Sequence, residues 1–448
     1  MPSDSLFAGL FAYGDAADLV TDRALANAMV EFELALLETL AELDLAPAQA
    51  ARELADALAS GRLELDLGEL GRGVGELGTP VPALLRSMRR QLPDSASAHL
   101  HKGATSQDVV DTAMMLVARR ALDPIVTDLV AAADACAELA GRWRQAIVPG
   151  RTLLQQALPV TFGLKAAGWL AGLDAAVAEL SAIRERELAV QFGGAVGTLA
   201  SLGDRGLEVA AGLADRLNLP APELPWHAIR LRPVRLANAL GVTLGLLGKV
   251  GRDVILLAQS EVAEVAEGGE EGRGGSSTMP HKRNPVGGIG LVACAQRGPG
   301  LVATMLGAMA QEHERGAGGW QAEWETLLEL LRLTASAAAI ARELLSGLEV
   351  DPEKMRADMD LTGGLVMSES VAAALAPSLG RAEAQKLVEQ AARRSAENAE
   401  DFRDVLLSIP EVRDGLGQER LDAALDPAGY LGVAGRLIDR ALAVHRGG

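Results

Sequence analysis

Apolar side chains recur every three or four residues along most of this chain, which is the spacing of long amphipathic α-helices. The clearest stretch is 236–267, where one side carries a continuous row of leucines and valines. Strand-forming runs are scarce, so the predicted fold class is all-α. Similar spacing predicts helices at 18–43, 108–120, 124–146, 161–188, 205–217, 288–309 and 320–345.

Turn-forming residues divide these helices into three predicted helical domains. Asp123 can cap a helix and Pro124 suits its first position, so a new helix is expected there. Asp351 and Pro352 mark the end of the long helices. A chain of 448 residues also exceeds the usual size of one core. The predicted domains are an N-terminal helical domain, a central long-helix bundle and a small C-terminal helical domain, at 1–107, 108–350 and 351–448.

The composition indicates a protein that buries apolar helix surface against other subunits. Apolar residues make up 49% of the chain and aromatic residues only 3%. No uninterrupted apolar run reaches the length of a membrane span, and the first residues do not resemble a secretion signal. The apolar excess is therefore expected to lie between subunits. Cys136 and Cys294 lie in apolar contexts without metal or redox spacing, as expected of a protein from the reducing cytoplasm.

Charge and motifs limit the classes of partner. A net charge of −18 argues against nucleic acid and against anionic membranes as partners. It does not exclude a small anionic substrate, because the field near 273–283 is basic. The chain has no dinucleotide fingerprint, no P-loop and no cluster of residues at metal-ligand spacing. We therefore expect neither a cofactor nor a metal.

Residues 274–285, Gly-Gly-Ser-Ser-Thr-Met-Pro-His-Lys-Arg-Asn-Pro, are the segment most suggestive of chemistry. Two glycines and two prolines favour a loop, which could simply be a solvated turn. Serine hydroxyls, cations and an amide together also suit anion chemistry: a serine moves a proton, while Lys282 and Asn284 hold developing negative charge. From the residues alone, Ser276 and Ser277 are equal candidates for the proton transfer.

This segment resembles the signature of the fumarase/aspartase superfamily, Gly-Ser-Ser-x-x-Pro-x-Lys-x-Asn. The resemblance implies that Ser276 is the catalytic serine and that Lys282 and Asn284 bind a substrate carboxylate. Two further segments, 103–108 and 150–156, resemble the other active-site segments of the superfamily. The residues that this resemblance makes candidates for substrate binding are His101, Thr105, Ser106, Arg151, Thr152, Gln155 and Arg283.

The segment 103–108 also has a purely structural interpretation. It reads as a helix start, where Thr105 or Ser106 caps the helix and Asp108 complements its dipole. Backbone donors at such a start can bind an anion as well, so the two interpretations are compatible. Weaker candidates for the pocket or its surroundings are His227, Arg232 and His313.

Two departures from the superfamily pattern bear on the reaction. The histidine that protonates the leaving group in lyases is Leu153 here, and the position of its partner glutamate is Ile289. An amine leaving group needs that acid, whereas a carboxylate departs or attacks already ionised. These residues argue against an adenylosuccinate-like or argininosuccinate-like lyase. A non-catalytic helical scaffold is a further alternative, opposed by the presence of Ser276, Lys282 and Asn284.

Within the superfamily, segments spread over most of the chain carry a narrower resemblance: 103–108, 154–159, 191–198, 225–227, 251–253, 272–285 and 311–315. In these segments the chain resembles the 3-carboxy-cis,cis-muconate cycloisomerases. The resemblance implies an isomerase of the protocatechuate branch of the β-ketoadipate pathway, with a small tricarboxylate substrate and no cofactor. It further implies a soluble, cytoplasmic homotetramer, in which the long helices form a tetrameric core and subunits share active sites.

Overall fold

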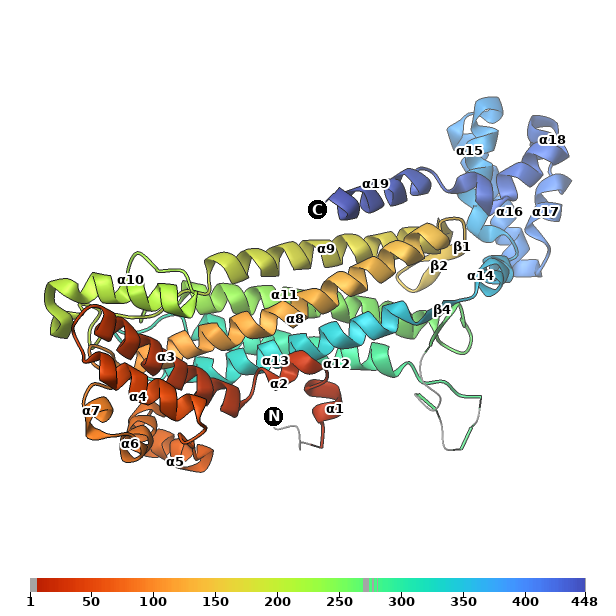
Figure 1. Cartoon of the computed structure of the whole chain (residues 1–448). Coiled ribbons are helices and arrows are strands. Elements are labelled where there is room, and N and C mark those ends of the chain that lie inside the picture. The colour runs from red at the N-terminus through yellow and green to blue at the C-terminus, as the bar shows by residue number, and fades with distance from the viewer. Residues whose placement is uncertain (1–5, 269–273, 276–277, 280, 448) are drawn as a thin grey trace. The chain divides into compact units, whose positions relative to one another are not determined.

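The structure is a computed structural model that describes residues 6–268, 274–275, 278–279 and 281–447. These residues form nineteen α-helices and four short strands, so the all-α prediction is confirmed (Figure 1). The chain divides into two compact units, which we call unit 1 and unit 2. Unit 1 comprises Met1–Val130, Ala175–Gly251 and Ile289–Arg342, and unit 2 comprises Ala131–Asp174, Arg252–Gly288 and Glu343–Gly448. The boundaries of three domains stay a prediction.

The apolar spacing correctly predicted five long helices, each of which contains residues of both units. Two of these helices differ markedly from expectation. The helix does not restart at Pro124 but continues through it, because Leu122 and Ile125 on either side are fully buried and their packing outweighs the missing hydrogen bond. The helix expected over 236–267 ends at Leu257. The five are α8 (Ser106–Arg142), α9 (Phe162–Arg186), α11 (Leu231–Leu257), α12 (Val286–Gly307) and α13 (Gly319–Ser346).

In unit 1, the parts of these helices pack side by side (Figure 1). A Cβ added at Gly241 of α11 would lie 2.4 Å from Val302 of α12, so only glycine allows this approach. Arg297 of α12 pairs with Glu329 of α13 at 2.6 Å. The core between the helices is largely leucine and alanine.

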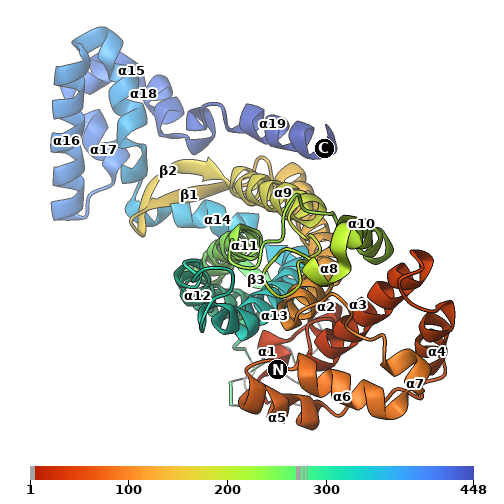
Figure 2. The same ribbon diagram turned by 90° about the vertical axis from the view of Figure 1, so that its left-hand side faces the viewer.

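Several of the shorter helices of unit 1 gather near α3. Figure 2 shows α4 to α7 gathered beside it. On another side α10 approaches closely, because a Cβ at Gly212 would lie 2.6 Å from Thr39. The shorter helices of unit 1 are α1 (Ala8–Phe11), α2 (Asp15–Asp18), α3 (Asp22–Glu42), α4 (Ala48–Ala59), α5 (Leu67–Leu77), α6 (Val81–Gln91), α7 (Asp94–Ser97) and α10 (Gly206–Leu217).

Unit 2 contains two small antiparallel strand pairs and a cluster of short helices. Strand β1 (Ile147–Thr152) pairs with β2 (Gln155–Thr161), and β3 (Val265–Glu267) pairs with β4 (Leu348–Val350). A separate apolar core, including Leu375 and Phe402, holds α15 to α18 together. The helices are α14 (Pro352–Met359), α15 (Ser368–Leu379), α16 (Arg381–Asn398), α17 (Phe402–Ser408), α18 (Pro410–Leu425) and α19 (Ala434–Gly447).

By length and composition alone, α9 and α12 could each cross a membrane. Only 39% and 28% of their most apolar windows are buried within the chain. Core helices of soluble proteins pass the same test, so this finding is weak evidence for a membrane. The exposed apolar surface of α12 still needs an explanation.

Candidate active site

His101 is fixed by a buried carboxylate from α3. Glu33 is fully buried, and its two oxygens accept hydrogen bonds from the backbone N–H of His101 at 2.9 Å and from its ring Nδ1 at 2.7 Å. His101 has a φ of +65°, a conformation that non-glycine residues rarely adopt. Sequence reasoning missed Glu33, although its spacing from Met29 and Leu37 places it on the apolar side of α3.

Asp108 joins the helix start of α8 to two distant loops. It is the third residue of α8, and its carboxylate accepts the backbone N–H of Thr105 at 2.9 Å, which is the back-reaching half of a capping box. The same carboxylate accepts the N–H groups of Gly193 and Gly194 and contacts Nε2 of His227 at 2.7 Å. The predicted helix start is therefore confirmed, and His227 lies buried as a support for it.

A buried cluster of charged residues includes Asp111, which lies on the next turn of α8. Arg230 bridges Asp111 and Glu323, with nitrogen–oxygen distances of 2.7 and 2.6 Å. Burial alone would lower the pKa of Arg230, but the two carboxylates outweigh burial and hold that pKa above its ordinary value. Trp320 Nε1 donates to Asp111 at 2.9 Å. The cluster fixes the loop that carries His227, and its members cannot be identified from sequence because 93 and 119 residues separate the partners.

Arg151, Thr152 and Gln155 meet on the β1–β2 hairpin in unit 2. Thr152 and Gln155 are paired across the turn, and both are exposed. Arg151 is not free in this chain: its guanidinium forms a bidentate ion pair with Glu264 at 2.7 and 2.9 Å. Glu264 is fully buried, and burial raises the pKa of its carboxyl group while Arg151 opposes that shift.

The turn of this hairpin consists of Leu153 and Leu154. Both have a left-handed backbone, with φ values of 51° and 64°, where glycine or asparagine is usual. Leu153 is 97% exposed and Leu154 72% exposed. Two leucines with a strained backbone therefore project from unit 2 without cover from the described residues, and Leu153 stands at the position where lyases of the superfamily carry a histidine.

The signature loop is described only in part. Ser276 and Ser277 lie outside the described residues. The base of the loop is closed because the backbone N–H and the side-chain amide of Asn284 both donate to the carbonyl oxygen of Gly274, at 2.8 and 3.0 Å. Lys282 and Arg283 are exposed, and Arg283 approaches Glu349 at 3.4 Å.

Glu267 connects this loop to α12. Its carboxylate accepts the N–H groups of Gly287 and Gly288 at 2.9 and 2.8 Å, so it caps the start of α12. Sequence reasoning did not single out Glu267. The cap fixes the helix that begins two residues after Asn284.

The structure therefore brings the predicted residues into two groups. His101, Thr105 and Ser106 belong to unit 1. Arg151, Thr152, Gln155, Lys282, Arg283 and Asn284 belong to unit 2. Of the weaker candidates, Arg232 donates to the carbonyl of Arg186 at 2.9 Å, and His313 has a φ of +46°.

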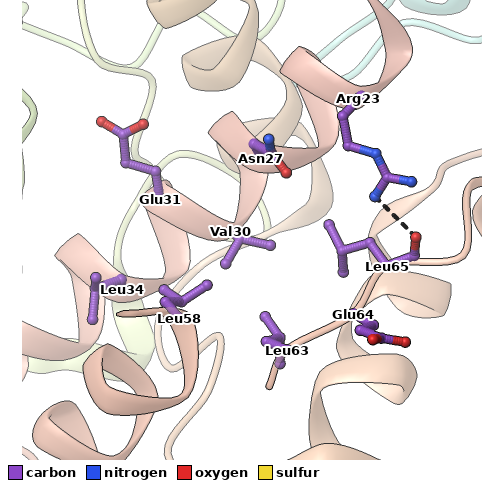
Figure 3. A pocket seen from close by; sticks show the side chains of 9 residues that line it. All are labelled: Arg23, Asn27, Val30, Glu31, Leu34, Leu58, Leu63, Glu64 and Leu65. Carbon is purple, nitrogen blue, oxygen red and sulfur yellow. Dashed lines mark hydrogen bonds between the residues drawn. The ribbon is translucent and has the colours of Figure 1, made fainter. Parts of the chain in front are cut away.

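One open pocket lies elsewhere in unit 1, between α3 and the chain that follows α4 (Figure 3). Its volume is about 580 Å³, with a leucine-rich floor and a rim that includes Arg23 and Glu64. None of the predicted site residues lines it. Within the described part of the chain, no group of histidine, cysteine or acidic residues is arranged to hold a metal.

Comparison with known proteins shows the family. Residues 16–295 match the family described as lyase, and residues 364–441 match the adenylosuccinate lyase C-terminus. The chain is 46% identical to the 3-carboxy-cis,cis-muconate cycloisomerase of Pseudomonas aeruginosa, over 99% of this chain and 97% of that protein. It is 42% identical to the nitrosuccinate lyase of Streptomyces davaonensis, over 94% of this chain and 91% of that protein.

A solved structure agrees with this family assignment. The 3-carboxy-cis,cis-muconate lactonizing enzyme from Pseudomonas putida matches with a TM-score of 0.92 and 41% identity. The match covers 98% of this chain and 99% of that one.

Proposed function

This chain belongs to the lyase family of the fumarase/aspartase superfamily, and we propose that it converts 3-carboxy-cis,cis-muconate to a carboxymuconolactone. The observation that carries the proposal is the similarity, over nearly the whole chain, to cycloisomerases of that name. The reaction places the protein in the protocatechuate branch of aromatic catabolism. Its substrate is then a small tricarboxylate.

Leu153 and Ile289 fit this reaction. In a lactonisation the nucleophile is a carboxylate of the substrate, which attacks in its ionised form. No leaving group has to be protonated, so lactonisation does not require the acid that amine-releasing lyases need. An aliphatic residue at each of these two positions is therefore compatible with lactonisation and unfavourable for release of an amine.

The roles of the signature loop follow from the charge that develops. The substrate's carboxylate attacks one carbon of a double bond, and the charge spreads onto a neighbouring carboxylate held by Lys282 and Asn284. Ser276 then hands a proton to carbon. The capped start of α12 and the closed base of the loop hold Asn284 in place. Arg283, Thr105 and Ser106 contribute further donors to the substrate.

A second candidate is a nitrosuccinate lyase, because one relative of that name is 42% identical over most of both chains. Nitrite is a weak base and can leave as an anion, so Leu153 and Ile289 are compatible with that reaction too. The two functions differ in substrate shape: a six-carbon chain with a branching carboxylate, against a four-carbon chain with a nitro group.

We also propose a soluble, cytoplasmic homotetramer with shared active sites. A row of exposed residues on α12, three of them glycine or alanine, lies at heptad spacing, which suits close helix packing between subunits. The strained leucines of the β1–β2 turn are exposed in the single chain, and a partner's pocket would cover them. Buried reduced cysteines agree with the cytoplasm. The row on α12 consists of Ile289, Gln296, Gly300, Ala303 and Gly307.

The test of function is an assay with purified protein, dialysed against a chelator because no metal is expected. Loss of the absorbance of 3-carboxy-cis,cis-muconate, with the lactone identified as product, supports the proposal. Nitrosuccinate is assayed in parallel at the same enzyme concentration. Unchanged muconate together with rapid release of nitrite would replace the first candidate by the second.

Sharing of sites is tested by mixing inactive variants. Ser276→Ala and Thr105→Ala proteins, dissociated and reassembled together, should recover part of the activity. Ser276→Ala mixed with Lys282→Ala is the matched control, because both changes affect the same loop and no mixed site is intact. Verified mixed tetramers without recovery, or an active monomer, would contradict shared sites.

A further inference from the structure

The structure contains a carboxylate–imidazole pair that the superfamily signature does not explain. Glu33 lies in the middle of α3 and is fully buried among apolar residues. A buried carboxylate requires hydrogen-bond donors and a balancing charge. Among the described residues, its hydrogen-bond partners are two groups of one residue, the backbone N–H and the ring Nδ1 of His101.

This arrangement determines which nitrogen of His101 is available. Because Nδ1 lies 2.7 Å from a carboxylate oxygen, that nitrogen carries a proton and donates it to the bond. The outer nitrogen, Nε2, is then the one that can face a ligand. The His101 side chain is 18% exposed while the Glu33 side chain is completely covered, so the pair has one accessible end.

The burial of Glu33 limits what can contact it. Within the described chain, the ring of His101 is the one ionisable group in contact with this carboxylate. The carboxylate therefore determines which ring nitrogen is turned inward and leaves Nε2 for a ligand.

The backbone of His101 has an unfavourable conformation, so the surrounding structure must hold the Glu33–His101 contact in place. His101 has a φ of +65°, a left-handed conformation that is unfavourable for a non-glycine residue. Gly103 follows with a φ of +87°, and a Cβ there would lie 2.7 Å from Leu202. Such turns concentrate at functional sites. This one leads directly into Thr105, whose backbone N–H is fixed by Asp108.

We propose that Glu33 is a positioning residue: it holds the ring of His101 through Nδ1, so that Nε2 is presented to the substrate. The proposal rests on the proposed function, since it assigns Nε2 to a contact with the tricarboxylate substrate. It extends that function by a residue of α3, 68 residues from its partner, outside every signature segment. The pair binds and orients, whereas the transfer of a proton to carbon remains with the loop serine.

The test is a double-mutant cycle with Glu33→Gln and His101→Asn. Glutamine keeps the size of the side chain and one acceptor but removes the charge. Asparagine tolerates the left-handed backbone and keeps the N–H bond to residue 33. Binding of propane-1,2,3-tricarboxylate, an unreactive probe, is measured by calorimetry, beside KM and kcat for the muconate. Glu31→Gln is the matched control, since Glu31 also lies on α3 but forms an exposed pair with Arg120.

Each single variant should weaken binding of the probe and raise KM by about tenfold or more, with kcat less affected. The double variant should bind no worse than His101→Asn alone, because Glu33 acts through His101. The control should bind as wild type does. Unchanged affinity in Glu33→Gln, losses that add in the double variant, or a wild type that does not bind the probe would overturn the proposal. A wild type that binds the probe but leaves muconate unchanged would refute the proposed function alone.

Discussion

The guanidinium of Arg151 forms a bidentate ion pair with the buried carboxylate of Glu264, at 2.7 and 2.9 Å. Arg151 therefore enters any substrate complex with part of its charge already compensated. Replacement by alanine leaves a buried carboxylate without its cation, which should cost roughly 3 kcal/mol of unfolding free energy. The double variant Arg151→Ala with Glu264→Gln should recover most of that loss.

The measurement that checks this prediction is denaturant unfolding of wild type, both single variants and the double variant. Measurements of activity separate the contribution of Arg151 to stability from a contact with the substrate. If the arginine also contacts substrate, the double variant regains stability but not kcat/KM. Equal stability of Arg151→Ala and wild type would contradict the importance of the pair.

A second prediction concerns the signature serine. Ser276→Ala should lower turnover by about a hundredfold or more while KM changes little, because the serine is needed to protonate carbon and not to bind substrate. Ser277→Ala is the neighbouring control and should keep most of the activity. Steady-state kinetics of both variants shows which serine transfers the proton. An active Ser276→Ala variant with an inactive Ser277→Ala variant would assign the proton transfer to Ser277.

A third prediction concerns the two aliphatic positions. Leu153→His with Ile289→Glu restores the residues of amine-releasing lyases, and we expect no gain in lactonisation. We expect a loss, because assembly would cover a titratable pair where apolar side chains now lie. Leu153→Gln with Ile289→Gln is the control for polarity without titration. The rate of lactonisation is measured for all three proteins. A clear increase in the His/Glu variant would show that the reaction can use the acid.

A fourth prediction concerns pH. His445 of α19 contacts Asp174 at 2.9 Å through Nδ1 and Asp134 at 3.0 Å through Nε2. Two carboxylates on one ring require the charged imidazolium, and the hydrogen bond to Asp174 is the main cause that raises the pKa of His445 above its ordinary value of 6.5. A raised pKa means that the contribution to stability is complete below pH 6.5 and disappears as pH rises through the folded pKa.

The difference in Tm between wild type and His445→Gln should therefore be larger at about pH 5.5 than at about pH 9. His99→Gln provides the control for loss of a histidine that lacks such a carboxylate pair. A difference that is the same at both pH values would mean that the contact with the two aspartates does not depend on charge.

The sequence predicts features that depend on neighbouring residues better than features that depend on residues far apart in the chain. Apolar periodicity located the long helices, because burial of one face is a local pattern. It failed at Pro124, where packing on both sides outweighs a local rule. The β1–β2 hairpin was missed because its turn uses Leu153 and Leu154 where asparagine or glycine would signal a turn.

At the candidate site, the signature supplied the residues but not their supports. Glu33, Glu264 and Arg230 act on partners 68 to 119 residues away, and nothing local in the sequence marks those pairs. The roles of Lys282, Asn284 and the serines remain proposals.

The most direct test of the proposed function compares substrates with and without an amine leaving group. Wild-type enzyme is assayed with 3-carboxy-cis,cis-muconate, adenylosuccinate and argininosuccinate under one set of conditions. Because the leaving-group acid is replaced by Leu153 and Ile289, kcat/KM for the muconate should exceed that for either amine-releasing substrate by at least about a hundredfold. Efficient cleavage of either succinyl amine would show that the amine receives its proton from another group, and the assignment as a cycloisomerase would be wrong.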